Sequence, residues 1–582
     1  MSASVRRGVA ERGARLASAT LIVAALLGRP AIGVAQEAPP DTSAARPASA
    51  DSVSAPPDSS RAAPDTATVK GLTVTGNVEG RRIRRIDVDA RGIFDPTPTD
   101  RFRFFYKLVD KLHVTTRDAA VRQQLPIEPG DKWTLTRGRE TMRMLRDMGI
   151  LNPQGLAAVE RGDSVDVEVV TRDAWSTSAE FTAAGGGGQL KGSFSLIERN
   201  LFGWGKKIGF SYRDDLVATS KSLEFQDPAV FGSRLRFSVV AADGSDGASQ
   251  SLYVGVPFYA EHVRQSFGYE SGRTTSIARL FLDDVQTAEF DRRRERAEVW
   301  YARGHQRGRS IWRGIASFRL DDRRLGPSRL APDAPPDFAG EEDNHRVRQP
   351  TLEGRYWRPR FVERTRVNEL GGVEDFDLGT RLAITGGFSF HALGATADEG
   401  FFGVSAGVGG EAGGLGYGWV SVDASSRFRQ IPQEGRIMAD ARWVAPIGDR
   451  NVLVVGVRAE KLKRPPRDLQ VIYGGLNGVR AFGVNELAGE AGWRWNIEER
   501  FALRRPIFKT VEVGTAVFLD AAQIDGPGID QPRFCDNVGA GLRISIPRFS
   551  SNRVARLDVA WPLQGANGKR DVVWSFGSSQ AF

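Results

Sequence analysis

The stretch Trp493-Arg494-Trp495-Asn496-Ile497-Glu498 indicates the fold class, because apolar and polar side chains alternate along it. Successive side chains of a β-strand point to opposite faces of the sheet. The two tryptophans and the isoleucine therefore share one face, and the arginine, the asparagine and Glu498 share the other. Apolar groups on the outer face and polar groups on the inner face are the pattern of a strand in a membrane β-barrel.

A second stretch, Val517-Phe518-Leu519-Asp520, alternates in the same way and places Asp520 on its inner face. Upstream, Arg480 stands in the glycine-rich segment Gly474-Gly475-Leu476-Asn477-Gly478-Val479-Arg480-Ala481-Phe482, which is typical of a loop. An arginine in a loop folded into the barrel could bind Glu498 and Asp520 bidentately. The competing interpretation is a solvated surface arginine and two ordinary strand acids.

The alternation recurs throughout residues 176–582. Further examples are Leu235, Phe237 and Val239; Leu252, Val254, Val256 and Phe258; Leu382, Ile384, Phe388 and Phe390; and Ala555, Leu557, Val559 and Trp561. About 400 residues, at roughly 25 per strand and connection, predict a transmembrane antiparallel β-barrel of about 16 strands. The sheet must close, because an open edge in lipid would leave backbone groups unsatisfied. A soluble all-β domain is the alternative, but it would not need an apolar outward face on so many strands.

The start of the chain indicates export. Residues 1–36 combine early arginines, a short apolar run and small residues around Ala35, which predicts a secretory signal peptide. The apolar run is shorter than the ~20 residues of a membrane-spanning helix. Residues 37–68 are rich in proline, alanine, serine and aspartate, so we expect a disordered linker there.

Residues 69–175 are expected to form a small α/β domain. A strand is predicted around residues 85–90, and the segment Thr115-Thr116-Arg117-Asp118 could cap a helix that Pro126 ends. A second helix is predicted over 136–148, with Gly149 as its stop. Strands over 155–160 and 164–171 follow, so the predicted order is strand, helix, helix, strand, strand.

Composition and charge exclude several classes of function. The net charge is +9, yet an exported chain meets no nucleic acid, and the basic residues are spread along strands rather than clustered. We interpret them as charges inside the barrel or facing anionic outer-membrane lipids. Cys535 is the single cysteine, so no intramolecular disulfide is possible. The histidines are scattered without zinc-ligand spacing, so we expect no enzyme, metal or cofactor; they are His113, His262, His305, His345 and His391.

The end of the chain carries a strand with aromatic residues on one face. Trp574, Phe576 and the terminal Phe582 share one parity, although Ser578 and Gln580 interrupt the apolar positions. A terminal aromatic residue on an amphipathic strand resembles the signal by which bacterial outer-membrane barrels are recognised during assembly. These three residues are therefore predicted to form a C-terminal barrel signal.

Over most of residues 80–582 the chain resembles the BamA/TamA superfamily of outer-membrane insertases and transporters. The predicted strand-helix-helix-strand-strand unit resembles one POTRA domain. The segments that resemble the superfamily's barrel are Ser193-Phe194-Ser195-Leu196-Ile197-Glu198-Arg199-Asn200-Leu201-Phe202-Gly203-Trp204-Gly205, Phe225-Gln226-Asp227-Pro228-Ala229-Val230-Phe231-Gly232, Phe518-Leu519-Asp520-Ala521-Ala522-Gln523 and Gly539-Ala540-Gly541-Leu542-Arg543. Their order and spacing together carry the resemblance. The insert over residues 94–114 and the single POTRA-like unit depart from it.

The superfamily's lumen loop carries an Arg-Gly-Phe/Tyr tip, which corresponds here to Arg480-Ala481-Phe482. Alanine lacks the freedom of glycine at positive backbone angles, so we expect this turn to differ from the superfamily's. The resemblance implies that the arginine contacts acids on late strands, which correspond to Glu498 and Asp520. Arg480, Phe482, Glu498 and Asp520 are therefore predicted to form a lock that holds the loop in the lumen.

The resemblance implies a non-enzymatic outer-membrane protein, with its N-terminal domain in the periplasm, that inserts β-barrel proteins or translocates polypeptide. Its expected partners are unfolded outer-membrane or exported polypeptides, outer-membrane lipids and periplasmic accessory proteins. The run Gly185-Gly186-Gly187-Gly188 would weaken pairing between the first and last strands, or would equally suit a simple turn. The alternatives are a passive pore, a two-partner-type secretion channel with one specific client, and an outer-membrane hydrolase.

Overall fold

The computed structural model describes residues 66–69, 71–93, 113–186, 189–214, 218–475, 477–503, 507, 511–545, 554–565 and 571–578. The predicted signal peptide, most of the predicted linker and Phe582 lie outside the described residues. Within these ranges, no helix is long and apolar enough to cross a membrane.

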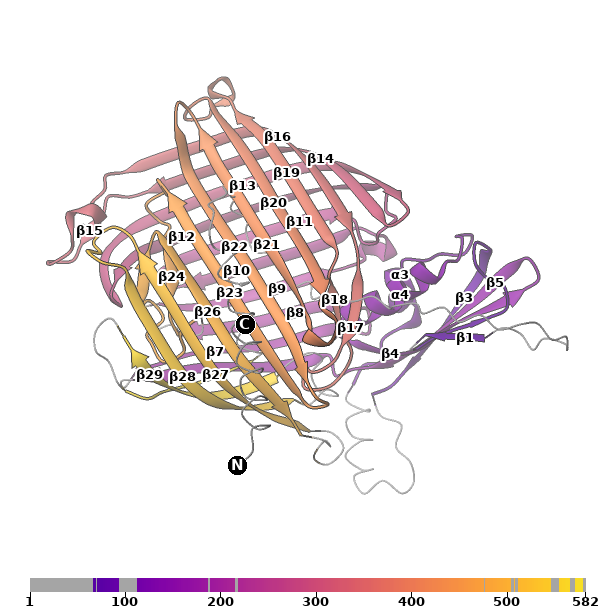
Figure 1. Ribbon diagram of the computed structural model, residues 1–582. Coiled ribbons are helices and arrows are strands. Elements are labelled where there is room, and N and C mark those ends of the chain that lie inside the picture. The colour runs from indigo at the N-terminus through magenta and orange to yellow at the C-terminus, as the bar shows by residue number, and fades with distance from the viewer. Residues whose placement is uncertain are drawn as a thin grey trace, which may run out of the picture.

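A closed antiparallel β-barrel makes up most of the described chain (Figure 1). Its wall strands are β6 (Thr177–Gly186), β7 (Gln189–Leu201), β8 (Lys206–Asp214), β9 (Thr219–Asp227), β10 (Arg236–Gly244), β11 (Gly247–Val256), β12 (Gln265–Leu282), β13 (Val285–Arg307), β14 (Ser310–Leu325), β16 (Asp343–Arg358), β19 (Thr380–Ser389), β20 (Glu399–Glu411), β21 (Tyr417–Phe428), β22 (Pro432–Ile447), β23 (Asn451–Lys463), β26 (Ala491–Ala502), β27 (Glu512–Asp525), β28 (Arg533–Ser545), β29 (Val554–Gln564) and β30 (Val573–Ser578). The last of these, β30, pairs with β6 and closes the barrel.

The predicted fold class is confirmed, but the predicted number of strands is wrong. Twenty long strands form the wall in the described ranges, and the two-residue β15 (Arg329–Leu330) pairs with β13. The estimate of about 16 assumed longer repeats than the chain uses. β8, β9 and β10 have only nine residues each, so more strands fit into the same length.

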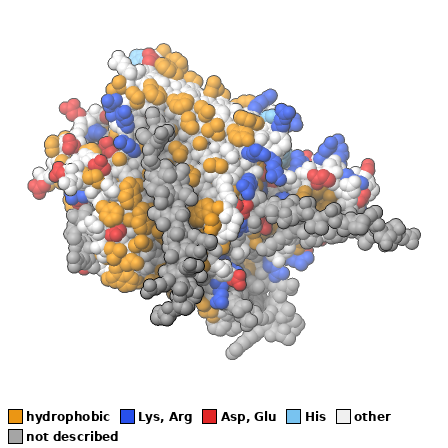
Figure 2. Space-filling model, in the orientation of Figure 1, with side chains coloured by type: hydrophobic (Ala, Val, Ile, Leu, Met, Phe, Trp, Pro, Cys, Tyr) orange, Lys and Arg blue, Asp and Glu red, His pale blue; other side chains and the backbone are white. Residues whose placement is uncertain are grey.

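The two faces of the wall differ as the alternation predicts. Large apolar side chains are exposed on the outside, among them Val299 and Tyr301 on β13 and Leu352 on β16. Figure 2 shows hydrophobic side chains spread over the visible barrel wall, with charged side chains gathered on the small domain and near the barrel ends. Arg294 and Asp321, which point inward, form an ion pair across β13 and β14 with a closest distance of 2.7 Å.

The N-terminal α/β domain has five strands and two helices. They are β1 (Thr66–Val69), β2 (Leu72–Thr75), β3 (Arg82–Arg91), α3 (Asp118–Gln124), α4 (Leu135–Asp147), β4 (Leu151–Arg161) and β5 (Ser164–Asp173), and the sheet order is β1-β2-β4-β5-β3. β1 and β2 were not predicted from the sequence, and β1 begins inside the predicted linker. These two short strands pair across Gly71, which has a φ of 76°.

Two details of the helices differ from expectation. The residue before α3 is Arg117, and no side chain caps this helix. Thr116 instead donates its backbone N–H to Asp173 at 2.7 Å and accepts a hydrogen bond from Asn200 on β7. Thr134 caps α4 by accepting the N–H of Arg137, and Gly149 follows the helix with a φ of 66°.

The domain has its own apolar core and docks on one end of the barrel, called here the domain end (Figure 1). Arg234, in the turn between β9 and β10, donates to the carbonyls of Gln123 and Leu125 at the end of α3. On α4, Arg143 binds Glu261 in the turn between β11 and β12 at 2.8 Å. The helices therefore face the barrel, whereas the far end of the sheet projects away from it.

Two hairpins between wall strands pair separately from the barrel. β17 (Phe361–Arg364) and β18 (Glu374–Asp377) lie between β16 and β19 at the domain end. β24 (Val471–Tyr473) and β25 (Leu487–Gly489) lie between β23 and β26 and form the stem of the predicted lumen loop. The described 3-10 turns are η1 (Val230–Gly232), η2 (Pro336–Phe338), η3 (His391–Leu393) and η4 (Gly413–Leu415).

Candidate functional site: the lumen loop and its polar cluster

The lumen loop is a short stem with a glycine-rich tip. Gly475 and Gly478 have φ values of 51° and 137°, which an L side chain rarely adopts. A Cβ atom on Gly478 would also lie 3.0 Å from the side chain of Arg494. Glycine here lets the backbone press against β26, and the Gly478 carbonyl accepts a hydrogen bond from Asn496 at 2.7 Å.

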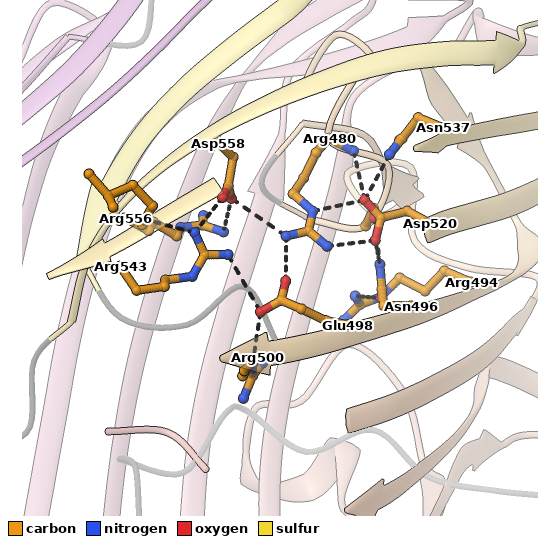
Figure 3. A network of polar contacts seen from close by, with 12 residues as sticks. Arg480, Arg494, Asn496, Glu498, Arg500, Asp520, Asn537, Arg543, Arg556 and Asp558 are labelled. Carbon is orange, nitrogen blue, oxygen red and sulfur yellow. Dashed lines mark hydrogen bonds and ion pairs between the residues drawn. The ribbon is translucent and has the colours of Figure 1, made fainter. Parts of the chain in front are cut away.

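Arg480, at the tip, reaches both acids that strand parity selected (Figure 3). Its Nε and Nη2 donate to the two oxygens of Asp520 at 2.8 and 2.9 Å, the bidentate geometry that arginine favours. Its Nη1 donates to Glu498 at 2.6 Å. The three residues are at most 3% exposed, so the solvated surface arginine of the competing interpretation does not describe this chain.

Asp520 is saturated with donors. Besides Arg480, the side chains of Asn496 and Asn537 donate to it at 2.8 and 3.0 Å. Asn537 also accepts the backbone N–H of Ala481 at 3.2 Å, so β28 holds the loop backbone directly. Asp520 therefore joins the loop to β26 and β28 as well as to its own strand.

Further charged residues complete the cluster, and the prediction did not include them. Asp558 on β29 lies 3.5 Å from Nη1 of Arg480 and pairs with Arg543 and Arg556 (Figure 3). Glu498 also accepts a hydrogen bond from Arg500 at 2.8 Å. Asp558 alternates with the outward residues of its strand, so the sequence places it on the inner face. Strand alternation alone does not show which residue it contacts there.

Aromatic rings pack around the charged groups. The ring centroid of Phe518 lies 3.3 Å from Cζ of Arg480, which places the cation over the ring. Phe482 is 3% exposed and packs with Phe518 and Tyr473 in one apolar cluster. A Cβ on Gly565 would lie 2.7 Å from the Phe482 ring, so the end of β29 covers it closely.

The backbone at Ala481 does not adopt the positive angle that would require glycine. Ala481 is not among the residues with positive φ, so its methyl group is compatible with the backbone. The strained angles lie instead at Gly474, Gly475 and Gly478. The loop therefore needs no glycine between the arginine and the phenylalanine.

The closing strands hold the described part of the predicted C-terminal signal. Trp574 pairs with Gly185, and Phe576 pairs with Ala183. The ring of Phe576 lies 5.9 Å from that of Phe181 on β6. Phe582 lies outside the described residues. Of the glycine run, Gly185 and Gly186 end β6, and Gly185 also pairs with β30.

No metal site is present in the described ranges, where no group of three or more His, Cys, Asp or Glu side chains could hold an ion. The segment Gly403-Val404-Ser405-Ala406-Gly407 matches the Gly-x-Ser-x-Gly pattern of hydrolases, a match that the sequence analysis missed. It lies inside β20 and pairs with β19 and β21. A nucleophile elbow needs a sharp strand-to-helix turn, so this serine is an ordinary barrel residue.

No family model matches this sequence. A stretch of 132 residues is 26% identical to Outer envelope protein 80, chloroplastic, from Arabidopsis thaliana, and covers 21% of this chain and 18% of that protein. The fold is similar to CdiB from Acinetobacter baumannii, at 12% identity, 86% coverage of this chain, 74% of that chain and a TM-score of 0.43. It is also similar to BamA from Haemophilus ducreyi lacking POTRA domains 1-3, at 13% identity, 85% coverage of each chain and a TM-score of 0.36.

At these identities and TM-scores the likeness to the two solved structures assigns no activity. The match to the chloroplast protein spans less than a fifth of that protein's length. The superfamily resemblance implied that Arg480 contacts Glu498 and Asp520. In the cluster, the loop arginine lies between these two acids.

Proposed function

We propose that this chain is a non-enzymatic outer-membrane protein that inserts β-barrel proteins or moves polypeptide across the membrane. The observation that carries the proposal is the composition of the barrel closure. In the described residues, β30 pairs with Ala183, Ala184 and Gly185 of β6. Glycine weakens strand pairing, so we take this junction to be a weak point of the wall.

A barrel that opens at this junction presents two unpaired strand edges. An exposed edge pairs with an incoming strand through backbone hydrogen bonds, which recruits a client without reading its exact sequence. The same opening would let a client strand leave sideways into lipid. Unfolded outer-membrane or exported polypeptides are therefore the proposed clients, and lipids and periplasmic accessory proteins the proposed partners.

The α/β domain supplies a second edge. In the described residues, β3 pairs with β5 on one side, and on the other side Ile83 exchanges backbone hydrogen bonds with Gly130 and Asp131. Beyond Ile83 the remaining edge carries arginines, Arg85 and Arg91, together with Asp87 and Asp89. We propose that this is a single POTRA-like domain in the periplasm that receives extended clients. The domain end of the barrel would then face the periplasm.

The lumen cluster stabilises the half of the wall that leads to the closure. Arg480 connects the loop to β26, β27 and β29 through Glu498, Asp520 and Asp558. These strands run up to β30, so the loop supports them from inside while the junction beyond them stays weak. This arrangement favours a wall that opens at one place over a uniformly stable pore.

The proposal is tested by reconstituting the protein in liposomes with a urea-unfolded eight-stranded outer-membrane barrel as client. We expect the client to reach its heat-modifiable folded form several-fold faster than in empty liposomes. A cysteine pair at Ala184 and Ser575, which are register partners, should abolish the gain when oxidised in a Cys535→Ser background. Equal folding rates with and without the protein, together with no protease-protected polypeptide inside the liposomes, would refute both arms of the proposal.

A further inference from the structure

A hairpin crosses the domain end of the barrel. We call residues Phe361–Asp377, which contain β17 and β18, the strap. It leaves the wall between β16 and β19, yet Arg500 on β26 donates to its Val367 carbonyl. β20, β21, β22 and β23 separate β19 from β26, so the strap spans the mouth from one part of the wall to another. Figure 1 places β17 and β18 between the barrel and α4.

The wall beneath the strap is apolar, unlike the charged lumen above it. Val454 on β23 is the register partner of Glu498, so it points into the lumen, and Val444 on β22 is the partner of Val454. These residues form one buried cluster with Tyr417 of the wall and with Val362 and Phe376 of the strap. The ring centroid of Phe376 lies 5.7 Å from that of Tyr417.

The strap presents a different face to the α/β domain. In its hairpin, Val362 pairs with Phe376 and Glu363 pairs with Asp375, so an apolar pair and an acidic pair lie on opposite faces. Arg146 on α4 binds both acids, with Nη2 at 2.7 Å from Asp375 and at 3.2 Å from Glu363. The strap is therefore an amphipathic β-segment held between an apolar wall and a cationic helix.

We propose that the apolar lumen wall of β21, β22 and β23 is a binding surface for an extended amphipathic polypeptide segment, which the strap occupies until a client displaces it. The inference rests on the proposed function and names the place where a client first enters the barrel. The strap itself shows which occupant fits, because its alternation of apolar and acidic residues is that of a barrel strand. A client strand would present its apolar face to the wall and its polar face to Arg146.

The strap leaves the wall as a unit, because some of its polar contacts hold its own turn together and others must break on release. Glu374 accepts the N–H groups of Val367 and Asn368 at 2.7 and 2.8 Å, so the turn of the strap holds its own shape when it leaves the wall. Arg442 on β22 donates to Asn368 at 2.8 Å, and this bond must break. A tethered strap competes at an effective concentration in the millimolar range, so a free peptide gains access only after the strap loosens.

A reversible lock tests the proposal. Gly371 of the strap and Glu512 on β27 are neighbours, because a Cβ on Gly371 would lie 2.5 Å from Cδ of Glu512, so cysteines are introduced at these two positions. The full chain would carry Gly371→Cys, Glu512→Cys and Cys535→Ser, with Phe376→Ala added to loosen the strap. The probe is a fluorescein-labelled peptide with the sequence of β29, Val554–Gln564, and the control peptide has the same composition in scrambled order.

We expect the β29 peptide to bind the reduced protein at least ten-fold more tightly than the oxidised protein, and more tightly than the scrambled peptide does. Each single-cysteine variant should be insensitive to oxidation. Phe376→Ala, which loosens the strap without touching α4, should raise peptide binding over wild type. Equal affinities in the reduced and oxidised states, equal binding of both peptides, or no gain from Phe376→Ala would each overturn the proposal. The liposome assay on the otherwise native chain decides the proposed function separately.

Discussion

The guanidinium carbon of Arg480 lies 3.3 Å from the ring centroid of Phe518, two residues before Asp520 on the same strand. Residues i and i+2 of a strand share a face, so β27 supplies both the ring under the cation and the carboxylate beside it. The planar guanidinium can stack on the ring and bind the carboxylate edge-on at once. A lysine ammonium has no such geometry.

Arg480→Lys is therefore expected to destabilise the barrel almost as much as Arg480→Ala. Lysine keeps the charge but cannot donate twice to Asp520 while also reaching Glu498. The measurement is the temperature at which the barrel loses its heat-modifiable folded form in a gel. Arg494→Lys is a matched control, since Arg494 also points into the lumen from β26 but hydrogen-bonds Asn496. A lysine variant as stable as wild type would show that bidentate binding is unimportant.

Arg480→Ala and Asp520→Ala should each destabilise the barrel by about 3–5 kcal/mol, because each strands a buried charge. The double variant should be little worse than either single variant, since residues of one network do not contribute independently. Unfolding in urea of the two single variants and the double variant measures the coupling. Additive losses would mean that the two residues do not act as one unit.

Asp558→Asn should also weaken the barrel, by about 1.5–3 kcal/mol, because Arg543 and Arg556 lose their shared counter-charge. Glu499→Gln is the control, since Glu499 lies on β26 next to Glu498 but on the opposite face. The same urea titration measures both. Equal destabilisation by the two substitutions would show that Asp558 does not contribute to the stability of the cluster.

Strand parity predicted the faces of Glu498, Phe518 and Asp520 without any structure, because one buried face fixes the register of a strand. It could not predict which inward residues meet across the lumen, since that depends on the number of strands and their stagger. Asp558 was missed for this reason. The strap was missed because a short alternating segment looks like one more wall strand. The segment from Thr115 to Asp118 was predicted to cap a helix because local signals do not show that a distant carboxylate, Asp173, binds the backbone N–H of Thr116.

Docking of the α/β domain should depend on pH. Burial and the nearby Glu261 carboxylate raise the pKa of Glu140 on α4 to about 7, although the Glu261 N–H, Arg143 and Arg137 oppose this. The docked state thus binds a proton that an exposed glutamate, with a pKa near 4.5, would release. The stabilisation of docking by this proton is fully present below pH 4.5 and is lost as the pH rises through 7.

Spin labels on cysteines at Asp163 and Arg309, in a Cys535→Ser background, report the distance between the domain and the barrel. The distance distribution should be narrow at pH 6 and broader at pH 8.5. Glu140→Gln should stay narrow at both values, because the amide keeps the acceptor for the Glu261 N–H without a charge. A wild-type distribution that does not change with pH would contradict this account of Glu140.

Residues 66–175 are expected to fold without the barrel, because the domain has a core of its own that includes Trp133, Leu145 and Val167. Circular dichroism of the isolated segment should show a cooperative thermal transition. The arginines on β3 should make acidic extended peptides bind more tightly than basic ones of the same length, with the difference falling as salt is added. A segment that stays unfolded, or that binds both peptides equally, would contradict the assignment of β3 as a receiving edge.

The central claim is that this chain handles polypeptides at the outer membrane, and depletion in cells that carry it tests this most directly. The measurement is a quantitative inventory of outer-membrane proteins and exported polypeptides after depletion, with wild type and Arg480→Ala supplied from a plasmid. The account predicts loss of at least one barrel protein or exported polypeptide, restored by wild type and not by Arg480→Ala. An inventory unchanged by depletion would contradict it.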